Sequence, residues 1–315
     1  MQLVRQTEQK GRLVRRWRMA GAALLVAALG SACAGGSGDE GAGRPVPAKP
    51  AQPAAGQQPR AEGAAGALGA YVDKVRQQRA ARVAAAKKWG LALPPLDPPE
   101  PPAVKPRITT RKGFETDGSG LPPVFTTVPT KQRIVFLTID DGAEKDPELL
   151  RMMSELKIPY SAFLSNYLVK EDYGYFRKMQ AGGVSLHNHT LTHPYLPGLD
   201  YDDQKRQICG MQDIIQKQFG KRPPLFRPPY GNYNEDTLRA AKSCGVKAVP
   251  LWASEAFPDH MEWREWDRDL HPGDIILTHF RGKEDWKGSM PDMIRKVMKT
   301  VTAKGYAVAR LEDYV

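Results

Sequence analysis

The alternation of short β-rich runs with amphipathic stretches constrains the fold of this chain more than any other feature of its sequence. Strands linked in this way run parallel through right-handed helical crossovers. Seven such units within residues 133–315 predict an α/β fold, an irregular (β/α)7 barrel, whose chemistry belongs at the carboxyl ends of the strands. The seven runs are 134–140, 160–165, 184–189, 225–230, 248–253, 274–279 and 306–311.

The chain before this region has a composition that predicts a tether. Residues 34–107 are rich in Ala, Gly, Pro and Gln, with too few large apolar groups to offset chain entropy, so we expect a flexible linker. An Ala-, Arg- and Lys-rich stretch near 70–90 could form a helix of marginal stability. Residues 108–132 form a pre-domain segment, and the sequence leaves open whether it packs on the barrel.

The first 33 residues have the pattern of an export signal. A basic stretch precedes an apolar run from Met19 to Leu29, and three small residues then lead into Cys33. This ending resembles a bacterial lipobox, so we expect a lipoprotein signal peptide over 1–33. A lipid on Cys33 would anchor the chain to the cell membrane, within the extracytoplasmic cell envelope. The alternative is an ordinary signal peptide with an incidental cysteine, and general secretion is expected over a twin-arginine route.

The net charge of +11 is concentrated outside the predicted barrel. Residues 1–112 carry 19 Lys and Arg against 7 Asp and Glu, a balance of +12, whereas residues 113–315 carry 27 against 28, a balance of −1. The barrel therefore has no basic excess of the kind that nucleic-acid binding needs, and we expect no nucleic-acid partner. We also expect a monomer.

Cys209 and Cys244 are the two cysteines of the predicted barrel. Export makes a disulfide between them permissible, and closing a loop of this size would stabilise the fold by about 3–4 kcal/mol. Two buried free thiols are the alternative. Neither cysteine has metal-ligand spacing, so neither is predicted to be catalytic.

Reactive side chains gather where the strands are predicted to end. The first run ends in the adjacent carboxylates Asp140 and Asp141, of which one can bind a metal while the other stays free as a base. The third run leads into His189 and His193, a spacing that would bring two imidazoles to one side of a helical turn. One carboxylate and two imidazoles would leave a coordination position open for water, which is typical of a catalytic metal site.

Two further runs bring residues to the same edge. The fourth run carries Arg227 and Tyr230 on either side of Pro228 and Pro229, and two prolines exclude an ordinary central strand. Arg227 is permanently charged and can pair with a carboxylate. The alternative is that it is a loop arginine without a role in catalysis. The sixth run ends at His279, which alone would more often be structural. Together these residues complete a set at one rim.

Four short motifs occur in order at these strand ends: TIDDG, HTLTH, RPPYG and LTH. Together they resemble the polysaccharide deacetylase family, the NodB-homology or carbohydrate esterase family 4 group, over roughly residues 130–315. The resemblance implies the irregular barrel of that family, with residues 133–315 as its catalytic domain. It also implies a hydrolase of carbon–nitrogen bonds other than peptide bonds. Ile139 stands where the family has phenylalanine, which is a conservative change.

The resemblance implies a role for each residue of the first two motifs. Asp141, His189 and His193 would hold a divalent metal, zinc or alternatively cobalt. Asp140 would be the general base towards the water that the metal activates. The chemistry would be hydrolysis of an acetamide.

The resemblance assigns the remaining roles to the other two motifs. Arg227 would keep the base ionised and oriented, and the backbone N–H of Tyr230 would stabilise the tetrahedral oxyanion. His279 would be the general acid that protonates the departing amine.

One stretch departs from the family pattern. The family has an Asp-Trp motif after the fifth strand, whose aspartate tunes the acid histidine. Here the candidates are Glu255, Asp259 and Glu262, and none of them matches cleanly. The residue that tunes His279 is therefore open.

The same stretch holds Trp252, Trp263 and Trp266. Aromatic faces stack on sugar rings, so Trp263 or Trp266 is expected to line a glycan groove. Trp252 is expected in the core.

These features predict an envelope-anchored deacetylase that acts on an N-acetylated polysaccharide, either the GlcNAc or MurNAc of peptidoglycan or a chitin-like polymer. An O-acetyl xylan esterase is an alternative with the same chemistry. A catalytically impaired glycan-binding lipoprotein on the same fold is an alternative from another class, supported only by the departure near residues 252–270. A different metal-dependent amide hydrolase is a third alternative, which would release no acetate.

Overall fold

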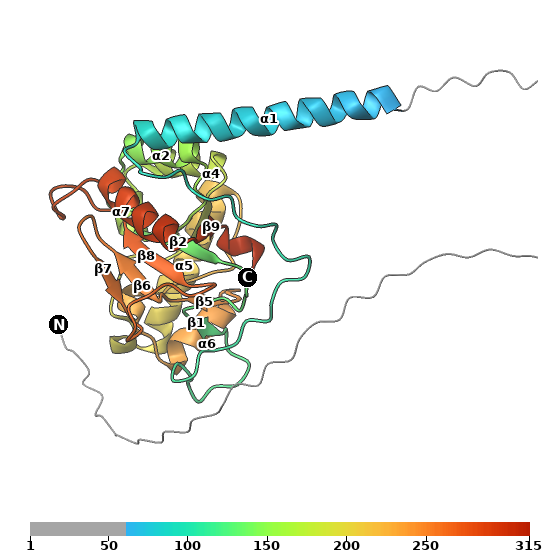
Figure 1. Cartoon of the computed structure of the whole chain (residues 1–315). Coiled ribbons are helices and arrows are strands. Elements are labelled where there is room, and N and C mark those ends of the chain that lie inside the picture. Colours follow the sequence, from blue (N-terminus) through green and yellow to red (C-terminus); the bar gives the residue numbers. More distant parts are fainter. Residues whose placement is uncertain (1–60) are drawn as a thin grey trace, which may run out of the picture. The chain divides into compact units, whose positions relative to one another are not determined.

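The computed structural model describes residues 61–315 (Figure 1). The predicted signal peptide, Cys33 and the beginning of the predicted linker lie outside the described residues and stay predictions. Within the described part, no helix combines the length and the apolarity that a membrane span requires.

Parallel strands form the centre of the domain, as the alternation predicts. The main strands are β2 (Ile134–Asp141), β3 (Ser161–Leu164), β4 (Ser185–Asn188), β8 (Ile275–His279) and β9 (Ala307–Ala309). β2 is buried along its whole length and pairs in parallel with β3, β8 and β9, while β4 follows β3. A parallel strand covered on both faces needs successive apolar residues, which the run Ile-Val-Phe-Leu supplies.

Short pieces complete the wall of the barrel between β4 and β8. β1 (Val124–Phe125) and β5 (Val249–Pro250) form a two-stranded parallel sheet. Isolated bridges join β4 to residues 225–226 and join those residues to the one before β5. Beside β1, the backbone N–H of Ile275 donates to the carbonyl of Thr126 at 3.1 Å. The barrel predicted from the sequence is thus present, in the irregular form.

The fourth predicted run, 225–230, does not form a strand. Only its first two residues make bridges, and Pro229–Gly231 forms a 3-10 turn, η2. Pro228 and Pro229 have no N–H to donate to a neighbouring strand, which explains why the ladder ends before them.

A short hairpin after β5 was not predicted. β6 (Ser254–Ala256) pairs in parallel with β8 and antiparallel with β7 (Met261–Trp263). The antiparallel return carries the chain away from the carboxyl edge of the sheet.

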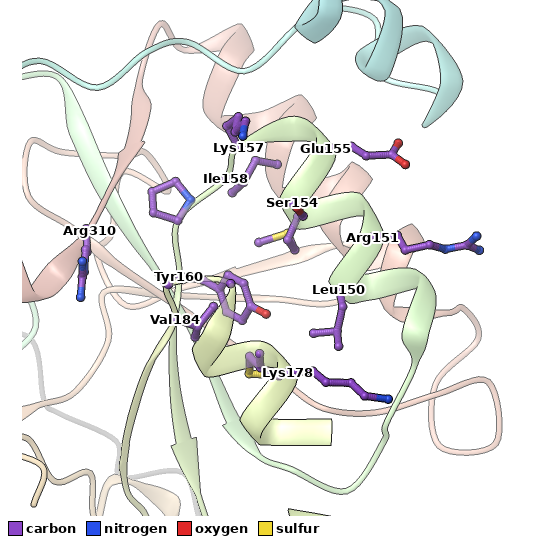
Figure 2. A pocket seen from close by; sticks show the side chains of 15 residues that line it. Leu150, Arg151, Ser154, Glu155, Lys157, Ile158, Tyr160, Lys178, Val184 and Arg310 are labelled. Atoms are coloured by element: carbon purple, nitrogen blue, oxygen red, sulfur yellow. The ribbon is translucent and has the colours of Figure 1, made fainter. Parts of the chain in front are cut away.

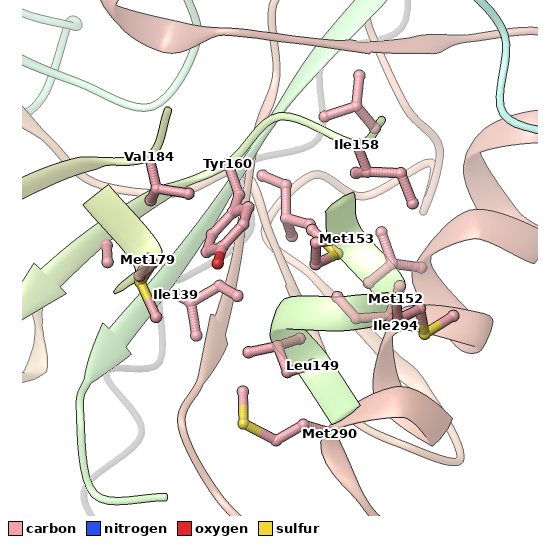
Figure 3. Packing of buried hydrophobic residues seen from close by; sticks show 14 of the residues in the cluster. Ile139, Leu149, Met152, Met153, Ile158, Tyr160, Met179, Val184, Met290 and Ile294 are labelled. Atoms are coloured by element: carbon pink, nitrogen blue, oxygen red, sulfur yellow. The ribbon is translucent and has the colours of Figure 1, made fainter. Parts of the chain in front are cut away.

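Helices cover the outside of the strands (Figure 1). They are α2 (Pro147–Leu156), α3 (Asn166–Val169), α4 (Tyr173–Ala181), α5 (Tyr201–Phe219), α6 (Glu235–Ser243) and α7 (Met290–Ala303), with 3-10 turns η1 (Leu196–Gly198) and η3 (Leu311–Asp313). α2 begins with an Asp146 side chain that accepts from the N–H of Glu148 at 2.8 Å, followed by proline at its first position. Its buried face, including Leu149 and Met153, belongs to one apolar cluster with Ile139 of β2 and Ile294 of α7 (Figure 3).

Residues 61–132 are more ordered than the flexible linker expected for most of them. α1 (Ala61–Lys88) includes most of the helix expected near 70–90 and begins earlier. Its carboxyl end is fixed to α2, because Trp89 is buried and its indole N–H donates to Glu155 at 2.7 Å. Residues 108–132 pack on the barrel, where the hydroxyl of Tyr233 donates to the carbonyl of Phe114 at 2.6 Å.

Cys209 of α5 and Cys244 at the end of α6 form a disulfide, with their Cα atoms 5.0 Å apart. Of the two alternatives for these cysteines, the structure has the bonded one. The bond joins two neighbouring helices on the outside of the barrel.

A cavity of about 590 Å³ lies at the amino ends of β3 and β4, between α2 and α4 (Figure 2). Its floor is apolar, with Ile158, Tyr160 and Val184, and Lys157 and Lys178 stand among the residues that line it. None of the predicted catalytic residues lines it. The residues predicted to be catalytic or to bind a metal on β2 and β8 lie at the opposite ends of the strands.

Candidate active site

The predicted residues converge at the carboxyl ends of the strands. Asp140 and Asp141 end β2, His279 ends β8, and Asp140 is paired in register with His279 on the neighbouring strand. His189 directly follows β4. A cavity of about 450 Å³ is lined by these residues, by His193 and by several aromatic side chains.

Asp141, His189 and His193 form a cluster that could hold a metal ion. One ligand atom from each lies within 4.8 Å of the others. The Oδ1 atom of Asp141 is 3.6 Å from the Nε2 of His189 and 3.4 Å from the Nε2 of His193. This Oδ1 is buried and has no hydrogen-bond partner in the described structure, as expected of an atom that binds an ion. The donor set therefore fits a divalent cation such as zinc.

The protonation states of His189 and His193 are those that metal binding requires. The Nδ1 atom of His189 lies 2.7 Å from the backbone carbonyl of Arg227, a partner that makes Nδ1 the protonated nitrogen and leaves Nε2 free for a ligand bond. Burial lowers the pKa of both His189 and His193 to about 4, so both are neutral at neutral pH. Neutral imidazole is the form that binds metals.

The segment that carries the two histidines is not the helical turn expected from their spacing. Residues 189–193 form irregular structure in which Thr190 and His193 have positive φ angles of 74° and 57°. The side chain of Asn188 accepts from the N–H of Thr190 at 2.8 Å, and the hydroxyl of Thr190 accepts from the N–H of His193 at 3.0 Å. These local hydrogen bonds compete with helix formation, and they fold the segment back so that the imidazoles still converge.

Left-handed backbone is concentrated at the site. Among the described residues, six other than glycine have positive φ, and four of these are Asp141, Thr190, His193 and Tyr230. Such conformations cost roughly 1–3 kcal/mol each and persist where surrounding contacts enforce them. At Asp141 the φ of 79° interrupts the extended backbone of β2, so side chains no longer alternate between the two faces of the strand. The adjacent carboxylates would otherwise point to opposite faces.

The break explains how two neighbouring carboxylates reach one imidazole. The Nε2 atom of His189 is 3.8 Å from Oδ2 of Asp140 and 3.6 Å from Oδ1 of Asp141. Gly142 follows with φ of 90°, and a Cβ there would lie 2.4 Å from a methyl carbon of Val169. Only glycine fits this turn without displacing its neighbour.

Asp140 is held by a buried arginine. The guanidinium of Arg227 donates to Oδ1 of Asp140 at 2.7 Å, to the hydroxyl of Thr138 at 2.9 Å and to the carbonyl of Pro250 at 2.7 Å. Burial raises the pKa of Asp140 to about 6, and the charge of Arg227 opposes a larger rise. Asp140 is thus an ionisable group whose pKa is close to neutrality, as a general base requires.

Glu255 is the acidic residue nearest His279 among the three candidates. Its Oε1 atom lies 3.4 Å from the Nδ1 of His279, because β6 and β8 are parallel neighbours. Asp259 is exposed and pairs with His260, and Glu262 lies across from Glu255 on β7. Burial, then repulsion by Glu262, raises the pKa of Glu255 to about 7. Burial lowers the pKa of His279, and the charge of Asp140 opposes that change.

The aromatic lining differs from the expectation. Trp252 packs against the core as expected and also lines the cavity, whereas Trp263 and Trp266 do not line the cavity. β7 carries these two away from the carboxyl edge, and Trp266 is 92% exposed. Trp286, which the sequence did not indicate, lines the cavity instead and packs edge-on against His279 with the ring centroids 6.1 Å apart.

Sequence reasoning also missed Arg281. Its guanidinium donates to Oδ2 of Asp141 at 2.8 Å. The available signal was its position two residues after His279, just beyond the end of β8. The exposed ring of Tyr230 completes this rim and packs against His193, with the ring centroids 4.7 Å apart.

Comparison with known proteins gives consistent findings. The family model described as polysaccharide deacetylase matches residues 127–249. An uncharacterised protein of Streptomyces coelicolor is 37% identical over 199 residues, which cover 63% of this chain and 79% of that protein. A peptidoglycan-N-acetylglucosamine deacetylase of Bacillus cereus is 24% identical over 64% of this chain and 96% of its own length. A solved family 4 carbohydrate esterase from Bacillus anthracis superposes with a TM-score of 0.50 and 26% identity, over 61% of this chain and 86% of that one.

Proposed function

Because the chain belongs to the polysaccharide deacetylase family, we propose that it hydrolyses the acetamide of an N-acetylated polysaccharide, namely peptidoglycan. The support for peptidoglycan is that a similar protein of Bacillus cereus is named a peptidoglycan-N-acetylglucosamine deacetylase. The reaction adds water across the amide bond of the sugar. It breaks the carbon–nitrogen bond and releases acetate and an amino sugar.

One observation carries the proposal. A single cavity is lined by three residues that could hold a metal ion, by the carboxylate of Asp140, which Arg227 binds, and by the imidazole of His279 on the adjacent strand. Asp141, His189 and His193 would hold a divalent cation, zinc or alternatively cobalt. A cation held by these three residues would polarise the amide carbonyl and lower the pKa of water. With only three protein ligands, coordination positions would remain for the amide carbonyl and for water.

The other residues divide the proton transfers between them. Asp140 accepts the proton of the attacking water, and Arg227 orients the carboxylate by donating to its Oδ1. The N–H of Tyr230, turned by a φ of 60°, donates to the developing oxyanion. His279, on the neighbouring strand, donates a proton to the departing nitrogen; its Nδ1 lies 3.4 Å from Oε1 of Glu255, which leaves its Nε2 for the substrate.

The glycan-binding alternative is not better supported. It was based on the departure from the family pattern at 252–270, and Glu255 of that stretch lies with its Oε1 3.4 Å from the Nδ1 of His279. For the location of the enzyme, we propose anchorage in the cell envelope through a lipid on Cys33, as the export pattern of residues 1–33 suggests.

Acetate release by the purified full chain tests the proposal. N-acetylated peptidoglycan, chitin oligomers and O-acetylated xylan serve as separate substrates, each with and without EDTA. We expect EDTA-sensitive release from peptidoglycan that Asp140→Asn abolishes. Asp236→Asn, which changes an exposed carboxylate on α6, is the matched control and should release acetate at the normal rate. Release from none of the three substrates, or undiminished release by Asp140→Asn, would show the proposal to be wrong.

A further inference from the structure

Each of the two neighbouring carboxylates of the site is bound by its own arginine. Arg227 donates to Oδ1 of Asp140 at 2.7 Å, and Arg281 donates to Oδ2 of Asp141 at 2.8 Å. The first arginine is fully buried, whereas the side chain of the second is 32% exposed and lines the cavity. The role proposed above for the first pair leaves the second pair unexplained.

Arg281 is held in place from its own segment. Its backbone N–H donates to the carbonyl of His279 at 3.0 Å, which fixes its Cα relative to the end of β8. Its Nη1 atom lies 3.7 Å from Oδ2 of Asp285, four residues further along the chain. The guanidinium therefore lies between two carboxylates, and only one of them belongs to the cluster.

The contact distinguishes the two oxygen atoms of Asp141. Oδ2 is occupied by the guanidinium, and Oδ1 faces the Nε2 atoms of His189 and His193 at 3.6 and 3.4 Å. Oδ1 is also the atom without a hydrogen-bond partner in the described structure. A carboxylate without such a partner could rotate or offer both oxygens to an ion, whereas one bound at Oδ2 presents a single oxygen in a fixed direction.

We propose that Arg281 is a positioning residue that fixes Asp141 as a one-oxygen ligand of the metal ion. The inference rests on the proposed function, because it concerns the metal of that site. Groups that orient a metal ligand from outside the coordination sphere typically change metal affinity by 10–100-fold. Arg281 would act in the same way through Oδ2.

Charge alone predicts the opposite effect. A guanidinium repels a divalent cation, so its removal would strengthen binding if Arg281 acted only as a charge. Two carboxylates, those of Asp141 and Asp285, compensate that charge in the structure. We therefore expect orientation to dominate, and the direction of the change separates the two effects.

The experiment measures zinc binding to the metal-stripped full chain by competition with a chromophoric chelator. We expect Arg281→Gln to raise the dissociation constant for zinc roughly 10–100-fold. Arg281→Lys, which keeps a charge and one donor, should recover part of the affinity. Arg295→Gln is the control, since the side chain of Arg295 is 35% exposed, close to the 32% of Arg281, and forms an ion pair with Asp292 on α7 away from this cavity.

A spectrum of the cobalt-substituted protein gives a second measurement that does not depend on turnover. Visible absorption bands of cobalt report its coordination, so a change in how Asp141 binds should alter their position or intensity in Arg281→Gln and leave Arg295→Gln unchanged. Circular dichroism of the metal-free variants verifies that each is folded.

The outcomes separate this inference from the proposed function. If wild-type protein binds neither zinc nor cobalt, the proposed function fails. If wild-type protein binds zinc and releases acetate, but Arg281→Gln has an equal or smaller dissociation constant and an unchanged cobalt spectrum, only the role of Arg281 is wrong.

Discussion

Replacing Arg227 by methionine tests whether a buried ion pair organises the site. The side chain is fully buried and donates to Asp140, to Thr138 and to the carbonyls of Pro250 and Leu251. Methionine fills much of the same volume but supplies no donor and no charge. The carboxylate of Asp140 would then remain buried without its ionic partner.

The expected magnitude follows from that orphaned charge. Breaking a buried ion pair by removing one partner costs about 3–5 kcal/mol in the free energy of unfolding. For a domain of this size, such a loss lowers the melting temperature by roughly 10 °C. If Asp140 is first changed to asparagine, Arg227 is the buried charge without a partner, and the methionine substitution removes it. The methionine substitution should therefore cost no more than about 1–3 kcal/mol in that background, through lost hydrogen bonds.

The assay is a double-mutant cycle. Urea denaturation of wild type, Arg227→Met, Asp140→Asn and the double variant gives four free energies of unfolding, and the coupling should be about 2 kcal/mol. Acetate release should also fall in Arg227→Met, because the base is less ionised. A cost below about 1 kcal/mol, or an equal cost in the Asp140→Asn background, would refute the reasoning.

Three further predictions concern other parts of the fold. Burial alone would raise the pKa of Glu312, but a hydrogen bond from His187 holds it at about 2. This pair therefore adds stability above about pH 4.5 and loses it as the pH falls towards 2, so Glu312→Gln should flatten the fall in unfolding free energy over that range. Serine at Cys209 and Cys244 should lower the unfolding free energy by about 3–4 kcal/mol in urea titrations, and an unchanged midpoint would contradict this. Glu255→Gln should lower kcat for acetate release roughly tenfold or more with little change in KM, and an unchanged kcat would exclude tuning of the acid.

The sequence predicts best what depends on local pattern. The run Ile134–Asp140 is strand in the structure because successive apolar residues suit a strand that is covered on both faces. The convergence of the four motifs followed from one rule, that parallel strands bring their carboxyl ends to one edge. The sequence permits a disulfide between Cys209 and Cys244 but does not distinguish it from two free thiols, because the distance between the cysteines depends on how their helices pack.

The features that were missed depend on contacts distant in the sequence. Arg281 and Asp141 are 140 positions apart, so no local pattern joins them. The position of Trp263 is set by the antiparallel pairing of β7 with β6, and strands of three residues are too short to be predicted from local sequence. The two histidines were expected on a helical turn because spacing alone does not show the hydrogen bonds that favour a left-handed turn at Thr190.

The charges of the site explain why it needs both arginines. Asp140 and Asp141 lie on one side of a buried imidazole, and two bare carboxylates in that position would repel each other and raise each other's pKa. Arg227 and Arg281 each neutralise one carboxylate, and burial keeps His189 and His193 uncharged. The two arginine–aspartate pairs and the two neutral imidazoles therefore carry no net charge together, and with a divalent cation in place this group of residues would have an excess of positive charge. Such an excess stabilises the anionic tetrahedral state of amide hydrolysis more than the neutral amide, which is the difference that lowers a reaction barrier.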